Sequence, residues 1–392
     1  MKGLAGLFLL LGACTPSFSE TFLVLPFFNT SGAKTIDWIG ESISEKITEA
    51  LAAEDLLIVQ RSDREKLFAD LKLRRYAPLT RGTIMEIAIN LDAGVVVFGD
   101  FEVGPGDGST PRPLTIRAEV VNVRAVRRDP PHTQSGSLDE LSQLQNRVAW
   151  YVLKAVLEAR APAYDAFLRR HRVTRLDALE NYIRGLTAVP VEQKLKLLSN
   201  AARLQEGFTQ PAFELGKLHW SRKDYKAAAE WLQKVDSSDP NHRDALFYLG
   251  LSRYMTGDFQ AAADALQTVA NAVPLAEVLN NLGAARHRLG EGEALSLFRR
   301  AIDSDSADPD YHFNAGFALW KQGRFEEAAE SFRAVLQRVP EDQLATLMLG
   351  RCLNRTGPRP GDPRSEGLER LKLEYSENAW RHLKAVLEPA RK

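Results

Sequence analysis

Two stretches in the second half of the chain share one pattern, and this pattern decides the fold. Residues 243–274 read RDALFYLGLSRYMTGDFQAAADALQTVANAVP, and residues 309–340 read PDYHFNAGFALWKQGRFEEAAESFRAVLQRVP. In both, a glycine is followed 12 residues later by an alanine, then by a large apolar residue, and a proline closes the unit. Each stretch therefore predicts two helices joined by a turn.

The same pattern covers the rest of this half at intervals of 33 or 34 residues. The glycines are Gly216, Gly250, Gly283, Gly316 and Gly350. The alanines are Ala228, Ala262, Ala294 (one residue early) and Ala328, followed by Leu232, Leu266, Phe298 and Phe332, with Pro240, Pro274, Pro309 and Pro340 at the ends. This period of helical pairs resembles the tetratricopeptide repeat.

The repeat has a physical explanation. A small residue lets two helices approach closely, the large apolar residue fills the space beside it, and proline ends the second helix. One hairpin cannot bury enough surface alone, so stability comes from stacking neighbours. We expect an all-α solenoid over residues 177–357, with about five hairpins and a partial one. Residues 177–208 form a degenerate first unit. Residues 358–392 are predicted to form a loop and a capping helix that carries Leu368, Leu371, Leu373, Trp380, Leu383 and Val386.

The resemblance also implies a binding surface, because the first helix of each tetratricopeptide unit lines the concave groove. The matching positions hold Phe213, Lys217, Trp220, Phe247, Leu251, Tyr254, Met255, Asn280, His287, Arg288, Phe313, Phe317 and Trp320. Aromatic residues anchor peptides with a large contact area, so we expect a protein or peptide partner there. The alternative is that several of these aromatics pack inside the solenoid or against the first domain. Phe247 departs from the carboxylate-clamp pattern, so chaperone C-termini are not expected ligands.

Residues 20–160 predict a compact α/β domain. Buried strands are expected at residues 22–25, 56–59 and 95–98, and a half-buried strand at residues 114–120. Helical apolar stripes lie between and after them, with capping boxes at Ser62–Glu65, Thr83–Glu86 and Ser137–Glu140. The predicted order is β-α-β-α-α-β-β-α.

Three segments of this domain resemble TolB-like and CsgG-like bacterial envelope proteins. They are VLPFFNTSG (24–32), LLIVQRSDREKLFADLKL (56–73) and DAGVVVFGDFEV (92–103). The resemblance covers roughly residues 20–130 and implies a fold and an envelope location. The chain has no spare pair of alternating segments that could line a membrane barrel, so the resemblance does not imply a pore.

The first 19 residues are predicted to be a signal peptide, since an apolar run at residues 3–13 follows Lys2. Leu11-Gly12-Ala13-Cys14 resembles a bacterial lipobox, which implies lipidation of Cys14 and anchoring to the membrane. The alternative is ordinary cleavage after Ser19. We therefore expect an exported periplasmic protein, associated with the outer membrane if it is lipidated.

Composition and motifs argue against several other classes. The 51 Lys and Arg residues balance 51 Asp and Glu residues, whereas nucleic-acid binders carry a basic surplus. Two cysteines and seven dispersed histidines do not match a metal site. The glycine-rich loop at residues 104–110 has no following lysine, so it does not match a phosphate-binding loop. We expect no enzymatic activity, no cofactor and no metal.

The junction at residues 161–176 carries Arg169, Arg170, His171, Arg172 and Arg175. This basic cluster is interpreted as a solvated helix end, with contact to phosphate head groups as the alternative. Together, these features favour an exported, membrane-anchored scaffold whose solenoid holds a protein or peptide. The alternative function is a sensor whose first domain binds a small ligand or glycan and whose repeats relay its binding.

Overall fold

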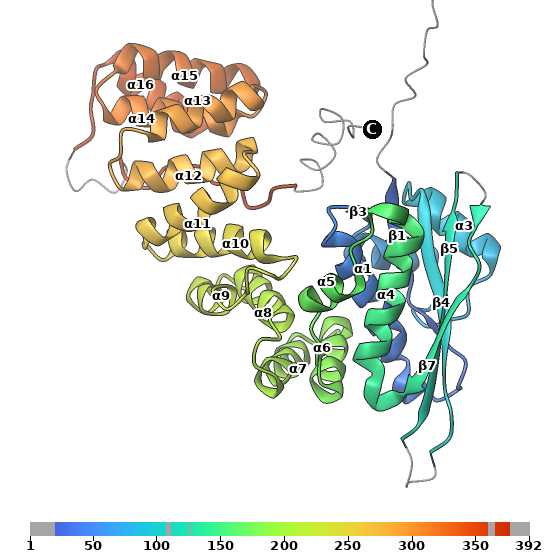
Figure 1. The fold of residues 1–392 in the computed structure, drawn as a ribbon. Helices are drawn as coiled ribbons and strands as arrows, with labels where there is room; N and C mark the ends of the chain where they lie inside the picture. The colour runs from blue at the N-terminus through green and yellow to red at the C-terminus, as the bar shows by residue number, and fades with distance from the viewer. Residues whose placement is uncertain (1–19, 107–110, 125–126, 360–364, 377–392) are drawn as a thin grey trace, which may run out of the picture.

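The computed structural model describes residues 20–106, 111–124, 127–359 and 365–376. A mixed β-sheet with helices on both faces comes first, and a stack of helices follows it (Figure 1). The predicted signal peptide and Cys14 lie outside the described residues. Within the described ranges, no helix has the length and apolar composition needed to cross a bilayer.

The sheet has the strand order β3-β1-β4-β5-β6, with β2 also paired to β4 and β7 to β5. The strands are β1 (Thr21–Val24), β2 (Phe28–Asn29), β3 (Leu57–Ile58), β4 (Val95–Val103), β5 (Pro113–Asn122), β6 (Arg127–Arg128) and β7 (His132–Ser137). β1 is parallel to β3 and β4, whereas β5 is antiparallel to β4 and β7. The sheet is therefore mixed.

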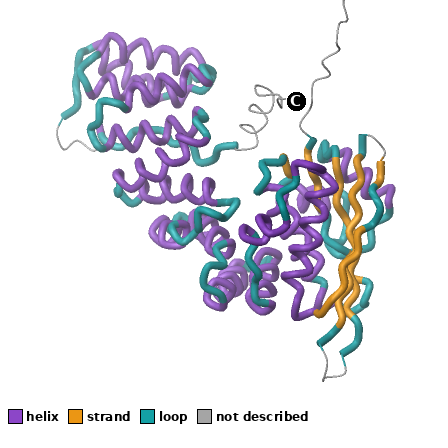
Figure 2. Tube along the Cα trace, in the orientation of Figure 1, coloured by secondary structure: helices purple, strands orange, loops and turns teal. Residues whose placement is uncertain are grey.

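Each face of the sheet has its own helical layer (Figure 2). Phe22 and Val24 point toward α1 (Trp38–Ala52) and α4 (Leu141–Leu157). Leu23 and Leu25 point the other way, toward α2 (Arg61–Asp70) and α3 (Arg81–Asn90). Successive side chains of a strand alternate between the two faces, so a short apolar strand with both faces covered has no polar positions.

The observed order differs from the predicted one by three additional strands, β2, β6 and β7. β7 has the sequence HTQSGS, which shows neither a buried run nor apolar alternation. Its strand conformation comes from backbone pairing with β5 over residues 132–137. A strand of this kind has little hydrophobic signal, which explains why the sequence did not predict it.

The helices after the sheet form hairpins that stack in sequence order. They are α5 (Tyr164–Arg170), α6 (Leu176–Thr187), α7 (Val191–Leu204), α8 (Gln210–Ser221), α9 (Tyr225–Leu232), α10 (His242–Met255), α11 (Phe259–Ala272), α12 (Ala276–Arg288), α13 (Ala294–Ser304), α14 (Pro309–Lys321), α15 (Phe325–Arg338) and α16 (Gln343–Leu353). In the described residues, α6 to α15 pair as five hairpins, and α16 follows as a single helix.

The first hairpin shares one hydrophobic core with the sheet domain. Ile183 of α6 and Leu198 of α7 belong to the same buried cluster as Ile43 of α1 and Val148 of α4. Phe167 of α5 is also buried in this cluster. The segment predicted as a junction is therefore partly packed into the core rather than a free linker.

The basic cluster of this segment is divided between core and solvent. His171 is buried, and its Nδ1 lies 3.1 Å from a carboxylate oxygen of Glu49. Arg170 is exposed and pairs with Glu54 at 3.0 Å. The interpretation as a wholly solvated helix end is thus wrong for His171, because the carboxylate of Glu49 gives that ring a partner inside the fold.

The glycine positions mark the closest approaches between paired helices. A methyl group added at Gly250 would lie 2.6 Å from Cγ of Leu266, and one at Gly283 would lie 2.8 Å from the Phe298 ring. A methyl group at Gly350 would meet nothing within 4 Å. α16 is the one solenoid helix in the described residues without a following partner helix, so its glycine is free of this constraint.

We expect Gly250→Ala and Gly350→Ala to have opposite effects on stability. At position 250 the new methyl group collides with Leu266, and overpacking of this kind costs about 1–3 kcal/mol. At position 350 the substitution meets open space and stabilises the helix by up to about 1 kcal/mol. Urea unfolding followed by circular dichroism measures both changes. Equal stability of the two variants would contradict the packing explanation of the repeat.

Candidate functional site

The predicted groove residues differ in exposure. Phe213, Phe247, Leu251, Asn280, Phe313, Phe317 and Trp320 are buried, Trp220, Tyr254, His287 and Arg288 are half-buried, and Lys217 and Met255 are exposed. The buried aromatics belong to the solenoid's own hydrophobic clusters. An open aromatic groove is therefore wrong for these side chains, and the alternative of packing inside the solenoid fits them, with the residues that follow α16 covering Phe247 and Phe313 as well.

Part of this surface is covered by the chain itself. Residues 366–375 lie along α10, α12 and α14, and in Figure 1 this red segment passes beside α12. We call residues 366–375 the C-terminal segment and the surface of α10, α12, α14 and α16 that it contacts the inner face. The segment is not helical, so the predicted capping helix is wrong over Leu368, Leu371 and Leu373. Trp380, Leu383 and Val386 lie outside the described residues.

Three asparagine side chains hold the backbone of the segment. Asn314 accepts a hydrogen bond from N–H of Arg370 and donates one to its carbonyl oxygen, both at 2.8 Å. Asn281 makes the same pair of bonds to Lys372, at 2.8 Å and 2.7 Å. Asn280 donates to the Arg370 carbonyl oxygen at 2.8 Å and accepts from Asn314 at 2.7 Å. The side-chain amides of Asn281 and Asn314 therefore recognise the peptide backbone of the segment, not its side chains.

The sequence analysis included Asn280 and missed Asn281 and Asn314. These two residues occupy the same position in consecutive units, each two residues before the repeat glycine. Asparagine is unfavourable inside a helix, and a buried amide needs hydrogen-bond partners. An asparagine two residues before the glycine in two consecutive units could therefore have indicated a polar ligand on the inner face.

A buried carboxylate of the segment meets three polar side chains. Glu369 is 1% exposed, and its oxygens lie 2.7 Å from Nδ1 of His287 and 3.1 Å from the hydroxyl of Tyr254. Arg288 lies 3.9 Å away. Burial alone would raise the pKa of Glu369, but its interactions with His287 and Arg288 lower it. The carboxylate therefore stays ionised inside the contact.

Two cations of the segment meet acids at the starts of α14 and α16. Arg370 pairs with Asp310 at 3.3 Å and with Asp342 at 2.8 Å. Its guanidinium lies 3.8 Å from the centre of the Phe313 ring, a favourable cation–π distance. Lys372 pairs with Asp308 at 2.6 Å and Asp310 at 2.7 Å. Burial would lower the pKa of Lys372, but hydrogen bonds to these two aspartates raise it.

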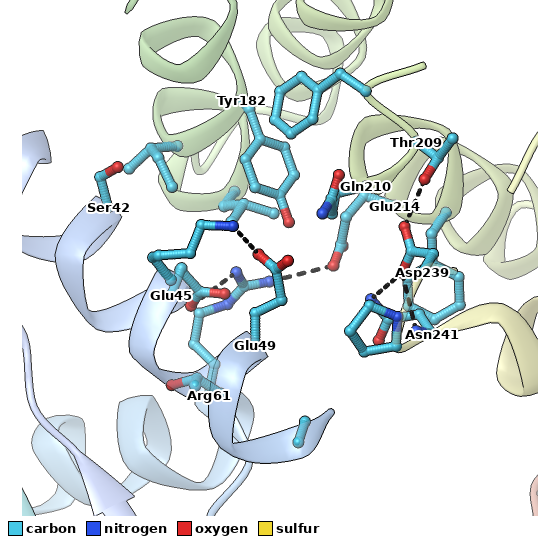
Figure 3. Close-up of a pocket in the computed structure, with 18 of the residues that line it drawn as sticks. Ser42, Glu45, Glu49, Arg61, Tyr182, Thr209, Gln210, Glu214, Asp239 and Asn241 are labelled. Atoms are coloured by element: carbon cyan, nitrogen blue, oxygen red, sulfur yellow. Dashed lines mark hydrogen bonds and ion pairs between the residues drawn. The ribbon is translucent and has the colours of Figure 1, made fainter. Parts of the chain in front are cut away.

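A second candidate site is a cavity of about 430 Å³ between the sheet domain and the first repeats (Figure 3). Its walls come from α1, the start of α2, α6, α8 and the loop before α10. The predicted groove residues Phe213 and Lys217 line this cavity. The cavity is predominantly polar and contains both acids and cations.

Charged pairs cross the cavity. Arg61 lies 3.4 Å from Glu45 of α1 and 3.6 Å from Glu214 of α8, which joins the two parts of the chain. Burial raises the pKa of Glu45, whereas the pKa of Glu49 is lowered to about 2 because Lys46 and His171 outweigh its burial. Figure 3 shows Glu45, Glu49, Arg61 and Glu214 around one space.

Asp239 provides a further carboxylate on the solenoid side of the cavity. It accepts a hydrogen bond from the hydroxyl of Thr209 at 2.6 Å and from N–H of Asn241 at 2.9 Å. Burial raises its pKa more than these two bonds lower it. The cavity can therefore offer hydrogen bonds and charges of both signs to a polar molecule. No group of three or more potential metal ligands occurs in the part of the chain that the structure describes.

Known families match the solenoid. Residues 214–277, 249–309, 292–342 and 313–357 match the family model described as Tetratricopeptide repeat. The predicted tetratricopeptide repeats are confirmed. The resemblance of residues 20–130 to TolB-like and CsgG-like proteins stays a prediction.

Individual relatives match part of the chain. The Cell division cycle protein 16 homologs of Homo sapiens and Mus musculus are 24% identical over 173 residues, which is 41% of this chain. The chain spans 28% of the length of these curated relatives.

Two solved structures are similar to part of this chain. MamA of Desulfovibrio magneticus RS-1 is 24% identical, with a TM-score of 0.38 over 42% of this chain and 95% of that chain. YrrB, described as a TPR protein with an unusual peptide-binding site, is 17% identical, with a TM-score of 0.35 over 50% of this chain and 93% of that chain.

Proposed function

We propose that this protein is a scaffold of the bacterial cell envelope that binds an extended segment of a protein partner on the inner face of its solenoid. The observation that carries this proposal is the pair of two-way hydrogen bonds from Asn281 and Asn314 to peptide backbone. Backbone groups occur in every polypeptide, so these amides can hold an extended segment from another protein. The peptide-binding site named for YrrB is consistent with this role.

The chemistry of the inner face also favours binding over catalysis. Its polar groups are matched in hydrogen-bonding pairs and ion pairs with the segment, and its aromatic side chains form a rigid base beneath them. A preorganised surface of this kind lowers the entropy cost of holding a flexible peptide. The inner face therefore has the properties of a docking surface.

The proposed scaffold requires the inner face to capture peptides other than its own segment. A chain ending at Gly357 lacks the C-terminal segment and is offered a phage-displayed library of random 12-residue peptides. We expect selected peptides to bind about tenfold or more weakly to the Asn281→Leu, Asn314→Leu variant, because four backbone hydrogen bonds worth about 1 kcal/mol each are lost. Isothermal titration calorimetry measures the affinities.

The matched control is Asn271→Leu, which changes an exposed asparagine on α11, outside the inner face. This variant should bind the selected peptides like the parent chain. Circular dichroism checks that all variants keep their helices. Failure to select any peptide, or full binding by the double variant, would overturn the proposed function.

The envelope location rests on the N-terminal sequence and on the resemblance of the sheet domain. The apolar run at residues 3–13 and the small residues before Cys14 support export and lipidation. We expect mass spectrometry of the protein from a bacterial envelope fraction to find an acylated Cys14 as the first residue. A free Glu20 at the N-terminus would support export without the anchor, and retention of Met1 would contradict both.

The cavity between the two parts favours a second candidate function, the sensing of a small polar ligand. The cavity is bounded by both parts of the chain, so a ligand there would contact α1 and α8 together. In this second candidate function both parts of the chain contact the ligand, whereas the sequence suggested a sensor whose first domain binds the ligand alone.

A thermal-shift panel of sugars and small zwitterions tests this candidate. We expect a true ligand to raise the unfolding midpoint of the full chain, since it binds only the folded state. Arg61→Gln should abolish the shift, whereas Arg299→Gln, an exposed control on α13, should retain it. A shift that survives Arg61→Gln would place the ligand elsewhere.

A further inference from the structure

The C-terminal segment meets the inner face in an ordered series of charges. Glu369 faces a hydroxyl and two basic side chains, whereas Arg370 and Lys372 face acids at the helix starts. The hydroxyl of Tyr375 donates to Asp244 at 2.7 Å, and its ring lies 4.6 Å from the Phe247 ring. At the other end, Glu366 pairs with Lys321 at 2.9 Å. The inner face therefore complements this sequence as well as its backbone.

The location of the segment argues against a role as the missing helix of the last unit. Gly350 of α16 has nothing within 4 Å of the place where a second helix would pack. The described part of the segment instead crosses α14, α12 and α10, which already have partner helices. It thus occupies the place that a bound partner would take.

Part of the contact between the segment and the inner face is accessible to solvent. Only Arg370 and Lys372 have backbone groups bound by the asparagines, and the side chains of Arg370 and Asp310 are 22% and 28% exposed. Partly exposed ion pairs contribute little to stability. A covalently attached segment still occupies its site efficiently, because its effective concentration there is high.

We propose that the C-terminal segment is a resident competitor of the partner, and that the partner presents the same pattern in an extended segment. The pattern is a glutamate, an arginine at the next residue, a lysine two residues later and an aromatic residue three residues after the lysine. The inference rests on the proposed function and names the chemistry of its ligand. The segment of the chain itself, 365–376, has the sequence SEGLERLKLEYS.

Charge explains why the partner must share the pattern. When the segment leaves, Asp308, Asp310 and Asp342 remain close together without their cations. His287 and Tyr254 lose the carboxylate that joins them. A ligand with the opposite charges would bring acids to acids, and juxtaposed like charges strongly disfavour a wrong partner.

The test measures binding of a fluorescein-labelled peptide, SEGLERLKLEYS, to the full chain by fluorescence anisotropy. When the C-terminal segment occupies the inner face, the apparent affinity for the peptide equals the intrinsic affinity multiplied by the fraction of chains whose inner face is open. We expect the Arg370→Ala, Lys372→Ala chain to bind the peptide about tenfold or more tightly than the parent chain. Lys372→Ala alone should give an intermediate gain.

Two controls separate this effect from others. Leu373→Ala changes a side chain of the same segment that is 53% exposed, and it should bind like the parent chain. A peptide with glutamate in place of its arginine and lysine should fail to bind the double variant. Thermal unfolding shows whether each variant keeps a folded solenoid.

Three results would overturn the inference. Equal binding of the charge-reversed peptide would mean that the inner face reads backbone alone, which leaves the proposed function intact. A double variant that unfolds, together with no gain for Lys372→Ala, would make the segment an integral part of the solenoid. Oligomers of the parent chain that the free peptide dissociates would identify the segment of a second copy as the occupant. Failure of the phage-selected peptides as well would instead overturn the proposed function.

Discussion

The solenoid depends on the close approach of paired helices at one glycine per unit. At Gly250 the facing side chain is Leu266, and at Gly283 it is Phe298. This contact leaves no room for a methyl group, so each pair of helices has a fixed separation. Because the first pair shares its core with the sheet domain, the stack begins from a fixed base. The position of every later helix follows from that base and from the repeated contact.

The fixed helices place three side-chain amides on the inner face, beneath the C-terminal segment. Asn280, Asn281 and Asn314 are fully buried in the presence of the C-terminal segment, and each has a hydrogen-bond partner. An unsatisfied buried amide costs free energy comparable to a lost hydrogen bond. The inner face therefore needs either water or a polypeptide along it, and the chain provides a polypeptide.

The repeats were predictable because a glycine recurs every 33 or 34 residues and is followed by an alanine and a large apolar residue. The start of the short 3-10 helix Leu138–Glu140, which leads directly into α4, was predictable for a local reason, since Ser137 and Glu140 form a capping box there. The start of α3 was misplaced, because Thr80 caps the helix and Thr83 donates its backbone N–H to it. A predicted helix start is misplaced by a few residues when another residue nearby can cap the helix instead.

The candidate site was only partly predictable, because several of its contacts join residues that are far apart in the sequence. Family positions led to Asn280, His287 and Tyr254, which contact the C-terminal segment. The aromatic positions were predicted to be open, yet Phe313 and Phe317 are buried in the solenoid core, and Arg370 of the C-terminal segment covers the Phe313 ring. Leu368 and Leu371 are three residues apart, as on one face of a helix, but backbone bonds to distant asparagines hold this segment in a non-helical conformation. A short stretch of sequence does not indicate contacts of this kind, which join residues far apart in the chain.

The two asparagines that hold the backbone are one unit apart, whereas the residues that they hold, Arg370 and Lys372, are two apart. The solenoid and its occupant run in opposite directions, since the later helix holds the earlier residue. A step of two matches the alternation of side chains along an extended chain, so α12 and α14 meet the same side of the ligand. A single residue inserted between the two bound positions would turn the following side chains to the wrong side.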